Sequence, residues 1–249
     1  MPSPHRFTNK VALVTGASSG IGRATAVRLV AEGARVLAAD IRQDALAALA
    51  SELGPQCATQ QCDVSDPAAA RATVAAAVAR FGVLDVLVNA AGILRTAHTH
   101  EETLEAWSRV LAVNLTGTFL MCQAAIPHLL ASRGSIVNLS STAALRAHAW
   151  TAAYSASKGG VLALTYELAV EYGQQGLRAN AVCPGGIRTP IHEAFQVPEG
   201  ADQKLVRRIM PLTGFAEPDE VAATIAFLAS DEAVHITGSM IRVDAAMCT

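Results

Sequence analysis

Three residues near the middle of the chain have the types and spacing of a proton-transfer unit. Tyr154 follows Ser141 by thirteen positions, and Lys158 follows Tyr154 by four. Residues four apart share one face of a helix, so Lys158 can lie beside the Tyr154 phenol or a bound cofactor. A free tyrosine ionises near pH ~10, and a nearby ammonium favours the phenolate and lowers that pKa. With Ser141 hydrogen-bonded to a substrate oxygen, the set predicts alcohol–carbonyl interconversion, provided that another group carries the hydride.

A glycine-rich turn near the N-terminus is the candidate binding site for that hydride carrier. It follows a short apolar run at 10–15 that predicts a buried strand, and it precedes a helical run. Its glycines permit a tight turn and bring a phosphate to the helix N-terminus. The spacing is G-x-x-x-G-x-G, which differs from the common dinucleotide fingerprint. The predicted cofactor-binding loop comprises Gly16, Ser18, Ser19, Gly20, Ile21 and Gly22.

Strand-like and helix-like runs alternate along the whole chain, and they must position these residues. The expected strands are 11–15, 35–39, 57–61, 84–89, 135–139, 179–183 and 240–243. The expected helices are 21–32, 44–53, 67–80, 104–130, 152–174 and 219–228. Such alternation predicts an α/β protein, a Rossmann-type doubly wound parallel sheet of about seven strands with helices on both faces. No repeat or linker divides residues 1–249, so we expect a single domain.

Ligands of such sheets bind beyond the carboxyl ends of the strands, and Asp40 falls at one of these ends. With its neighbour Ile41 it is expected to contact the adenine ribose, where a carboxylate accepts hydrogen bonds from the hydroxyls and repels a 2′-phosphate. The alternative is an aspartate that only caps a turn or helix. Arg42 could tolerate a phosphate, so the sequence favours NAD without excluding NADP.

Other strand ends supply further candidates for cofactor contacts, each with a purely structural alternative. Asp63 and Val64 would contact the adenine ring, unless they only start a helix. A turn at Asn89, Ala90 and Gly92 lets backbone approach a cofactor or simply braces neighbouring strands. A third group could hold a nicotinamide carboxamide or form an ordinary turn, and it consists of Pro184, Gly185, Ile187 and Thr189. Asn114 lies in a helical run. It would either relay protons to Lys158 through water or be a buried amide whose hydrogen bonds are all made within the fold.

The least regular stretch, 186–215, is the candidate substrate lid. Long irregular segments in compact domains are often functional, and a mobile surface excursion is the alternative. The substrate pocket is expected to be mostly apolar, which favours a neutral cyclic or aliphatic alcohol. Beside Ser141, its predicted residues are Leu145, His148, Trp150, Gly186, Ile187, Ile191, Phe195 and Met210.

Composition excludes several classes of function. The net charge is −2 with no basic stripe, which argues against nucleic-acid binding. The first residues lack an apolar segment, and no run of roughly 18 unbroken apolar residues occurs, so we expect neither a secretory signal nor a membrane span. Five cysteines without a C-x-x-C motif favour a reducing cytoplasm. The set His98, His100, Glu101 and Glu102 lacks zinc-like spacing, so no metal site is expected.

Taken together, these motifs resemble the short-chain dehydrogenase/reductase family over essentially the whole chain. The matching positions are Thr15-Gly16-x-x-x-Gly20-Ile21-Gly22, Asp63, Asn89-Ala90-Ala91-Gly92, Asn114, Ser141, Tyr154-x-x-x-Lys158 and Pro184-Gly185. The resemblance implies that Tyr154 is the general acid/base, that Ser141 polarises the substrate oxygen, and that Lys158 lowers the Tyr154 pKa and binds the nicotinamide ribose. It also implies that Asn114 continues the proton relay.

The same resemblance bears on cofactor, assembly and C-terminus. Ser19 stands where NADP-dependent members often carry a basic residue, which favours NAD. Members commonly form homotetramers through helices that match 104–130 and 152–174. The usual Asp-Gly-Gly after the last strand reads Asp244-Ala245-Ala246 here. We expect that departure to alter a C-terminal turn or a subunit contact and to leave the chemistry unchanged.

The sequence therefore predicts a cytoplasmic NAD(H)-dependent oxidoreductase that interconverts a secondary alcohol and a ketone. The enzymatic alternative is a 3-oxoacyl-[acyl-carrier-protein] reductase that uses NADPH, for which the basic residues Lys204, Arg207 and Arg208 could meet the carrier. A non-catalytic nucleotide-binding sensor that keeps the fold is the third hypothesis. A small-molecule substrate, and neither nucleic acid nor membrane, is the expected partner besides the chain's own copies.

Overall fold

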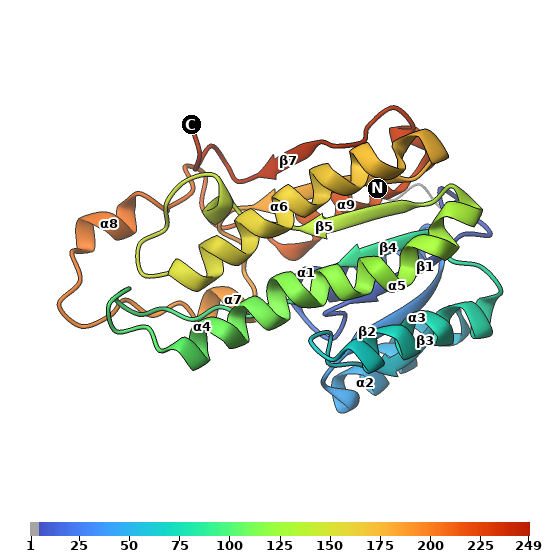
Figure 1. Cartoon of the computed structure of the whole chain (residues 1–249), viewed down its shortest axis with the longest axis horizontal. Coiled ribbons are helices and arrows are strands. Elements are labelled where there is room, and N and C mark those ends of the chain that lie inside the picture. Colours follow the sequence, from blue (N-terminus) through green and yellow to red (C-terminus); the bar gives the residue numbers. More distant parts are fainter. Residues whose placement is uncertain (1–4) are drawn as a thin grey trace.

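A computed structural model describes residues 5–249, which form a parallel sheet between two layers of helices (Figure 1). Within this range the sheet has seven strands in the order β3-β2-β1-β4-β5-β6-β7, as expected for a doubly wound fold. The strands are β1 Val11–Thr15, β2 Arg35–Asp40, β3 Cys57–Gln61, β4 Val86–Asn89, β5 Ser135–Leu139, β6 Arg178–Pro184 and β7 Met240–Val243. Every neighbouring pair is parallel, so all carboxyl ends meet at one edge of the sheet.

In the described residues, seven longer helices pack on the sheet or on one another, and two short ones lie outside it. The long helices are α1 Gly20–Ala31, α2 Gln43–Leu53, α3 Pro67–Phe81, α4 Leu104–Leu111, α5 Gly117–Ser132, α6 Ala152–Tyr172 and α9 Pro218–Ala229. The predicted strands are all present, and so are the predicted helices except the one over 104–130, with ends that move by a few residues. The candidate lid 186–215 contains the elements absent from the prediction, α7 Pro190–Glu193 and α8 Gln203–Arg207.

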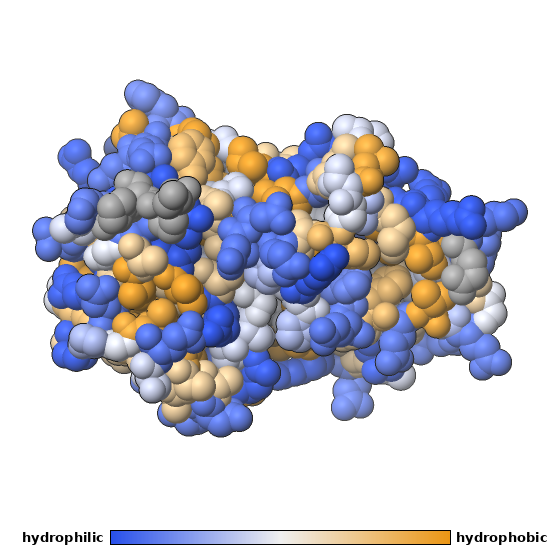
Figure 2. Space-filling view, turned by 180° about the vertical axis from the view of Figure 1, so that it is seen from behind, coloured by the Kyte–Doolittle hydropathy of each residue, from blue (hydrophilic) through white to orange (hydrophobic). Residues whose placement is uncertain are grey.

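Alternate residues of the central strands supply two separate hydrophobic cores. In β1, Ala12 and Val14 pack into one core with α1, α2 and α9, whereas Val11 and Leu13 pack into the other with α3, α5 and α6. A strand covered on both faces must be apolar at every position, which explains the unbroken apolar run in the sequence. Seen from the side opposite to Figure 1, apolar surface residues form separate patches among hydrophilic ones (Figure 2).

The run predicted as one helix over 104–130 is interrupted. Between α4 and α5 the residues Ala112–Thr116 form a π-helix, and Asn114 lies at its centre. Such π-bulges occur frequently at functional sites. The stretch Leu104–Ser132 is long and apolar enough to cross a membrane, but half of its most apolar window is buried inside the fold. A helix that covers a sheet and fills a core has the same composition, and α5 does both.

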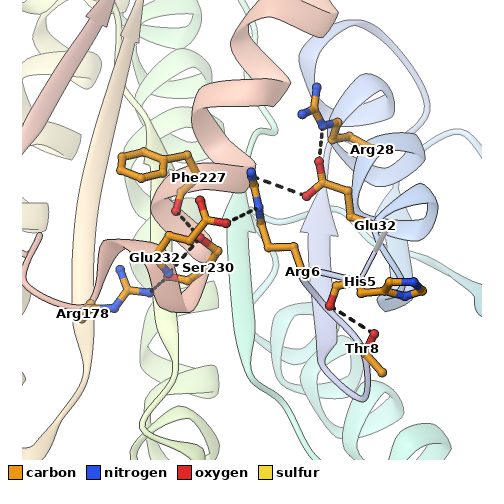
Figure 3. A network of polar contacts seen from close by, with 9 residues as sticks. All are labelled: His5, Arg6, Thr8, Arg28, Glu32, Arg178, Phe227, Ser230 and Glu232. Atoms are coloured by element: carbon orange, nitrogen blue, oxygen red, sulfur yellow. Dashed lines mark hydrogen bonds and ion pairs between the residues drawn. The ribbon is translucent and has the colours of Figure 1, made fainter. Parts of the chain in front are cut away.

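At the amino ends of the strands an ionic network joins the N-terminal segment to the sheet (Figure 3). The Glu32 carboxylate is fully buried and forms two ion pairs. Its oxygens lie 2.5 Å from Arg28 Nε and 3.5 Å from Arg6 Nη1. Arg6 also contacts Glu232 at 3.2 Å, in the 3₁₀ turn that follows α9. Removing one partner would leave a buried charge uncompensated, which is strongly destabilising. The network therefore holds the edge of the sheet that faces away from the site described next.

Candidate active site

A cavity of about 520 Å³ opens at the carboxyl ends of the strands. Its wall passes from the glycine-rich turn after β1 to the lid segment 186–215, and it includes Ser141, Tyr154 and Lys158. The volume lies in the range typical of ligand pockets. Residues at the ends of β1 to β6 line it because parallel strands end at the same edge. The candidate proton-transfer unit and the candidate phosphate loop, far apart in the sequence, thus share one cavity.

The proton-transfer unit is assembled by α6 and by the segment that follows β5. Tyr154 and Lys158 lie one turn apart on α6, and the Lys158 Nζ is 5.7 Å from the centroid of the Tyr154 ring. Lys158 is 4% exposed, and its Nζ donates a hydrogen bond to the Leu139 carbonyl at 2.7 Å. Ser141 caps a short 3₁₀ turn, where its Oγ accepts from the Ala143 N–H at 3.1 Å. The spacing in the sequence therefore predicted the correct grouping.

Burial decides the protonation of this unit. It raises the pKa of the Tyr154 phenol above its ordinary value, and a hydrogen bond with Ser141 acts in the opposite direction. Burial also lowers the pKa of the Lys158 ammonium to about 8. The Tyr154 pKa is thus raised where the sequence predicted a lowering by Lys158, because desolvation is the largest influence on this phenol. At neutral pH the tyrosine is protonated and the lysine is mostly charged.

Asn114 lies behind the cavity wall. Its Oδ1 accepts from the Ile93 N–H at 2.8 Å, and its Nδ2 donates to the Ile93 carbonyl at 2.9 Å and to Ser157 Oγ at 3.1 Å. Both amide hydrogens are therefore committed, which corresponds to the structural alternative for this residue. A Cβ placed on Gly92 would lie 3.4 Å from Asn114 Oδ1 and 3.5 Å from Lys158 Nζ. Asn114 thus braces the backbone next to Lys158, and a relay through its side chain stays a prediction.

The N-terminus of α1 faces the cavity without a cap. Ser19 occupies the cap position but makes no side-chain hydrogen bond to the first turn, and that turn contains no acidic residue. Gly20, Ile21 and Gly22 line the cavity, so free N–H groups and the positive end of the helix dipole point to it. By contrast, the Asp66 side chain caps α3. The uncapped turn is suited to an anion such as a phosphate.

Close packing explains two of the glycines in this loop. A Cβ on Gly22 would lie 2.2 Å from the Gly16 carbonyl oxygen. Gly16 itself has φ +65°, and a Cβ there would lie 2.8 Å from the backbone of Ala90. Thr15 fixes the same junction because its Oγ1 accepts from the Ala90 and Ala91 N–H groups at 3.2 Å. The turn after β1 is thus shaped by its contact with the end of β4.

Asp40 and Arg42 line the cavity where it passes the end of β2. The Asp40 carboxylate accepts from the Ser18 N–H at 3.2 Å and from the Arg42 N–H at 3.0 Å. The Arg42 guanidinium donates to Ser18 Oγ at 2.7 and 3.1 Å and lies 3.8 Å from the Asp40 carboxylate. Ser18 does not line the cavity, contrary to the expected cofactor contact, because its side chain serves Arg42.

Asp63 lines the cavity, and Asn89 does not. Asp63 accepts from Ser65 and lies 3.3 Å from Arg109, and these hydrogen bonds hold the pKa of its carboxyl below the usual value. Asn89 is buried, and its Nδ2 donates to Asn138 Oδ1 at 2.9 Å. It therefore ties β4 to β5, as its bracing alternative predicted, and does not reach the cavity.

The remaining predicted cofactor contacts line the cavity without exception. They are Ile41, Val64, Ala90, Gly92, Pro184, Gly185, Ile187 and Thr189. Thr189 also caps α7, since its Oγ1 accepts from the His192 N–H. The turn after β6 thus passes directly from a strand end into the lid segment.

Of the residues predicted for the substrate pocket, His148, Gly186, Ile191, Phe195 and Met210 line the cavity, and this part of the wall is the candidate substrate end. Burial, with the positive charge of Arg146, lowers the pKa of His148 to about 4, so the ring is neutral at pH 7. Two predicted pocket residues do not line the cavity. Trp150 packs into the fold, 8% exposed, and Leu145 is 36% exposed to solvent. Proximity to Tyr154 in the sequence suggested Trp150, whose φ of 65° lies in the left-handed region just before α6.

Sequence reasoning missed several residues of the substrate end. Ile93, Leu94, Ile209 and Phe215 line it as apolar side chains from irregular backbone. Met247, two residues from the C-terminus, is also in the wall and is 5% exposed. No local pattern marks a methionine in a terminal turn as a pocket residue. Only the packing of that turn on Gly185 and Gly186 brings it there.

Comparisons with known proteins place this geometry among oxidoreductases. A family model described as enoyl-(acyl carrier protein) reductase matches residues 16–247. The chain is 43% identical to the D-threitol dehydrogenase of Mycolicibacterium smegmatis, covering 96% of this chain and 93% of that protein. It is 41% identical to a 3-oxoacyl-[acyl-carrier-protein] reductase of Thermotoga maritima, with 96% and 98% covered. A 3-ketoacyl-(acyl-carrier-protein) reductase from Brucella melitensis complexed with NADH superposes with a TM-score of 0.90, at 32% identity and with 98% and 100% of the two chains covered.

Proposed function

Because the chain belongs to the short-chain dehydrogenase/reductase family, we propose that it is an NAD(H)-dependent oxidoreductase that interconverts a secondary alcohol and a ketone. The observation that carries the proposal is the single cavity that joins an uncapped helix N-terminus to Tyr154, Lys158 and Ser141. A pure nucleotide-binding sensor would have no need of that buried proton-transfer unit. The NADH-bound relative supports the nicotinamide cofactor.

The residues that line the cavity fit a dinucleotide along its whole length. The free N–H groups of the first turn of α1 suit the pyrophosphate. Asp40 and Asp63 would hold the adenosine half, and the backbone of Gly185, Ile187 and Thr189 the nicotinamide half. A bound nicotinamide supplies the hydride in ketone reduction and accepts it in alcohol oxidation.

The proton is transferred by Tyr154, with the help of Ser141 and Lys158. In ketone reduction the phenol, protonated at neutral pH, donates its proton to the carbonyl oxygen as hydride reaches the carbonyl carbon. Ser141 orients that oxygen by a hydrogen bond. In alcohol oxidation the phenolate removes the hydroxyl proton, so a raised Tyr154 pKa predicts faster oxidation as the pH rises. Lys158 places a positive charge beside the ring and stabilises the phenolate when it forms.

The preference for NAD over NADP is supported by Asp40, whose carboxylate faces the cavity. A 2′-phosphate at the ribose would approach this carboxylate and be repelled. Arg42 is held on Ser18 and lies within reach of the same carboxylate, which reduces that repulsion. We therefore propose that the protein prefers NAD over NADP by a moderate factor.

The substrate is proposed to be a neutral cyclic or aliphatic alcohol or the matching ketone. The substrate end is lined chiefly by aliphatic and aromatic side chains, and His148 carries no charge at neutral pH. The segment 186–215 is proposed as the lid because it supplies many of these side chains. A homotetramer is the proposed assembly, supported by the exposed apolar residues Phe119, Tyr166 and Val170 on α5 and α6.

A ketone panel tests the function. Purified protein is mixed with NADH or NADPH and with cyclic, steroid, aliphatic or acetoacetyl-thioester ketones, and nicotinamide absorbance is followed. We expect NADH oxidation with a neutral ketone. Tyr154→Phe should lose roughly 10²–10⁴-fold in rate while it still binds NADH, because only the acid/base group is removed. Near-normal turnover by Tyr154→Phe would contradict the proposed mechanism.

A 3-oxoacyl-[acyl-carrier-protein] reductase is the second candidate, and the Thermotoga maritima relative favours it. Lys204, Arg207 and Arg208 on and beside α8 are exposed, as docking of an acidic carrier would require. NADPH oxidation with the thioester, in preference to NADH oxidation with a neutral ketone, would select this candidate.

A further inference from the structure

The last six residues fold into a compact turn, here named the C-terminal hook, 244–249. Asp244 organises it: its carboxylate accepts from the Ala246 N–H at 3.2 Å and the Cys248 N–H at 3.1 Å. Two arginines hold it from outside. Arg146 donates to the Met247 carbonyl at 2.6 Å, and Arg242 donates to the Cys248 carbonyl at 3.0 Å. In Figure 1 the C-terminus lies at the same end of the sheet as α8 and the segment that leads into α6.

Inside the hook, the Met247 side chain is directed at the turn after β6. The Gly186 N–H donates to the Met247 Sδ at 3.2 Å. A Cβ placed on Gly185 would lie 2.5 Å from the same sulfur. The thioether therefore occupies the space beside two glycines of the cavity wall. With 5% exposure, this methionine is a buried wall residue although it lies near the chain end.

The hook also touches the lid segment. The Leu212 N–H donates to the Ala245 carbonyl at 3.1 Å. A Cβ placed on Gly186 would lie 2.7 Å from the Phe215 ring. Gly186 is thus close to both Met247 and the lid segment, so the position of one affects the space left by the other. The sequence predicted that the departure at Ala245 and Ala246 alters a C-terminal turn and leaves the chemistry unchanged, and that stays a prediction; the contact with the cavity wall is made by Met247 in the same turn.

We propose that Met247 is a specificity-determining residue, whose side chain limits the size of the ketone or alcohol accepted at the substrate end. This inference rests on the proposed function, since it assigns the substrate bulk that the same cavity accepts. Methionine is unbranched and fills irregular gaps, so its replacement by alanine frees room. Alanine and leucine both remove the sulfur that accepts from the Gly186 N–H, so the freed volume is what distinguishes them. A loss of three heavy atoms at the wall should admit a bulkier ring.

The experiment compares Met247→Ala with Met247→Leu, which conserves volume. Two neutral ketones are used, cyclohexanone and a steroid ketone. Binding of each to the protein–NADH complex is measured by the change in NADH fluorescence, and turnover by absorbance. For Met247→Ala we expect the ratio of steroid to cyclohexanone, in both binding constant and kcat/KM, to rise roughly 10-fold or more. Met247→Leu should stay within about threefold of the native ratio.

Several outcomes would overturn the inference. The first is a folded Met247→Ala whose ratio of steroid to cyclohexanone is unchanged. The second is an equal change of that ratio in Met247→Leu. The third is a Met247→Ala that changes only the affinity for NADH. If Met247→Ala fails to fold, Arg146→Gln loosens the same hook and should raise the ratio in the same direction, and an unchanged ratio there overturns the inference. Absence of turnover in the native protein contradicts the proposed function, whereas the binding ratio still decides the role of Met247. Absence of binding of either ketone to any variant overturns both.

Discussion

The two ends of the cavity are built in different ways. At the cofactor end, three wall residues lie at the ends of strands: Gly16 follows β1, Asp40 ends β2, and Asp63 comes just after β3. At the substrate end, His148, Phe215 and Met247 come from irregular backbone in three distant parts of the chain. The first end is fixed by the sheet, and the second depends on how loops and the C-terminus pack. We therefore expect substitutions at the cofactor end to abolish binding and substitutions at the substrate end to retune it.

The largest effect is expected from Gly22→Ala at the cofactor end. The new Cβ would lie 2.2 Å from the Gly16 carbonyl oxygen, so the loop must change shape. Overpacking of this kind costs typically about 1–3 kcal/mol, and NADH affinity should fall roughly 100-fold. Fluorescence titration with NADH measures it. Gly173→Ala is the control, because a Cβ there meets nothing within 4 Å. If Gly22→Ala binds NADH as tightly as Gly173→Ala does, the cofactor end of the cavity is not rigid.

A pH-dependent loss of stability is expected next, at the substrate end. The pKa of His148 is about 4 in the folded chain, below the ordinary value of 6.5. Between these values the unfolded chain binds more protons, so the free energy of unfolding falls as the pH falls from about 6.5 to 4. His148→Gln should remove about 1–2 kcal/mol of that fall. Urea titrations of both proteins at pH 7 and pH 4.5 measure it, and parallel losses would show that His148 is not the group responsible.

Asp40→Ala should change the cofactor preference by a smaller amount. Loss of the carboxylate removes the repulsion of a 2′-phosphate and leaves Arg42 free to meet it, so the NADP/NAD ratio of kcat/KM should rise about 10-fold. Arg42→Ala in the same background should reverse most of the gain. An unchanged ratio in Asp40→Ala would place the adenosine ribose elsewhere than this end of the cavity.

The smallest effect is expected in the C-terminal hook. Ala246 has φ 63° and Ala245 φ 45°, a left-handed conformation that costs an L-residue roughly 1–2 kcal/mol. Ala246→Gly should relieve part of it and raise the free energy of unfolding by about 0.5–1 kcal/mol in urea titrations. Ala75→Gly, at an exposed position inside α3, is the opposite control and should lower stability by a similar amount. A destabilised Ala246→Gly would mean that the hook carries no backbone strain.

The fold was predictable from the sequence because its signals are local. Apolar runs bounded by helical stretches identified all seven strands of residues 5–249, and the glycine spacing identified the turn after β1. The same local logic failed in 104–130, where Asn114 lies in a π-helix between two α-helices. It failed again at Trp150, whose φ of 65° turns the backbone before α6 and removes the ring from the cavity.

By itself, the sequence determined the sheet, the glycine-rich turn after β1 and the grouping of Ser141, Tyr154 and Lys158. These depend on strand ends and on one helical repeat, and both are set by neighbouring residues. Only the tertiary structure decided the protonation of Tyr154 and Lys158, since desolvation depends on everything packed around a group. It also decided the substrate end, where Met247 reaches Gly186 across 61 positions of the chain. No local pattern encodes such a contact, because it exists only once the last strand has joined the sheet.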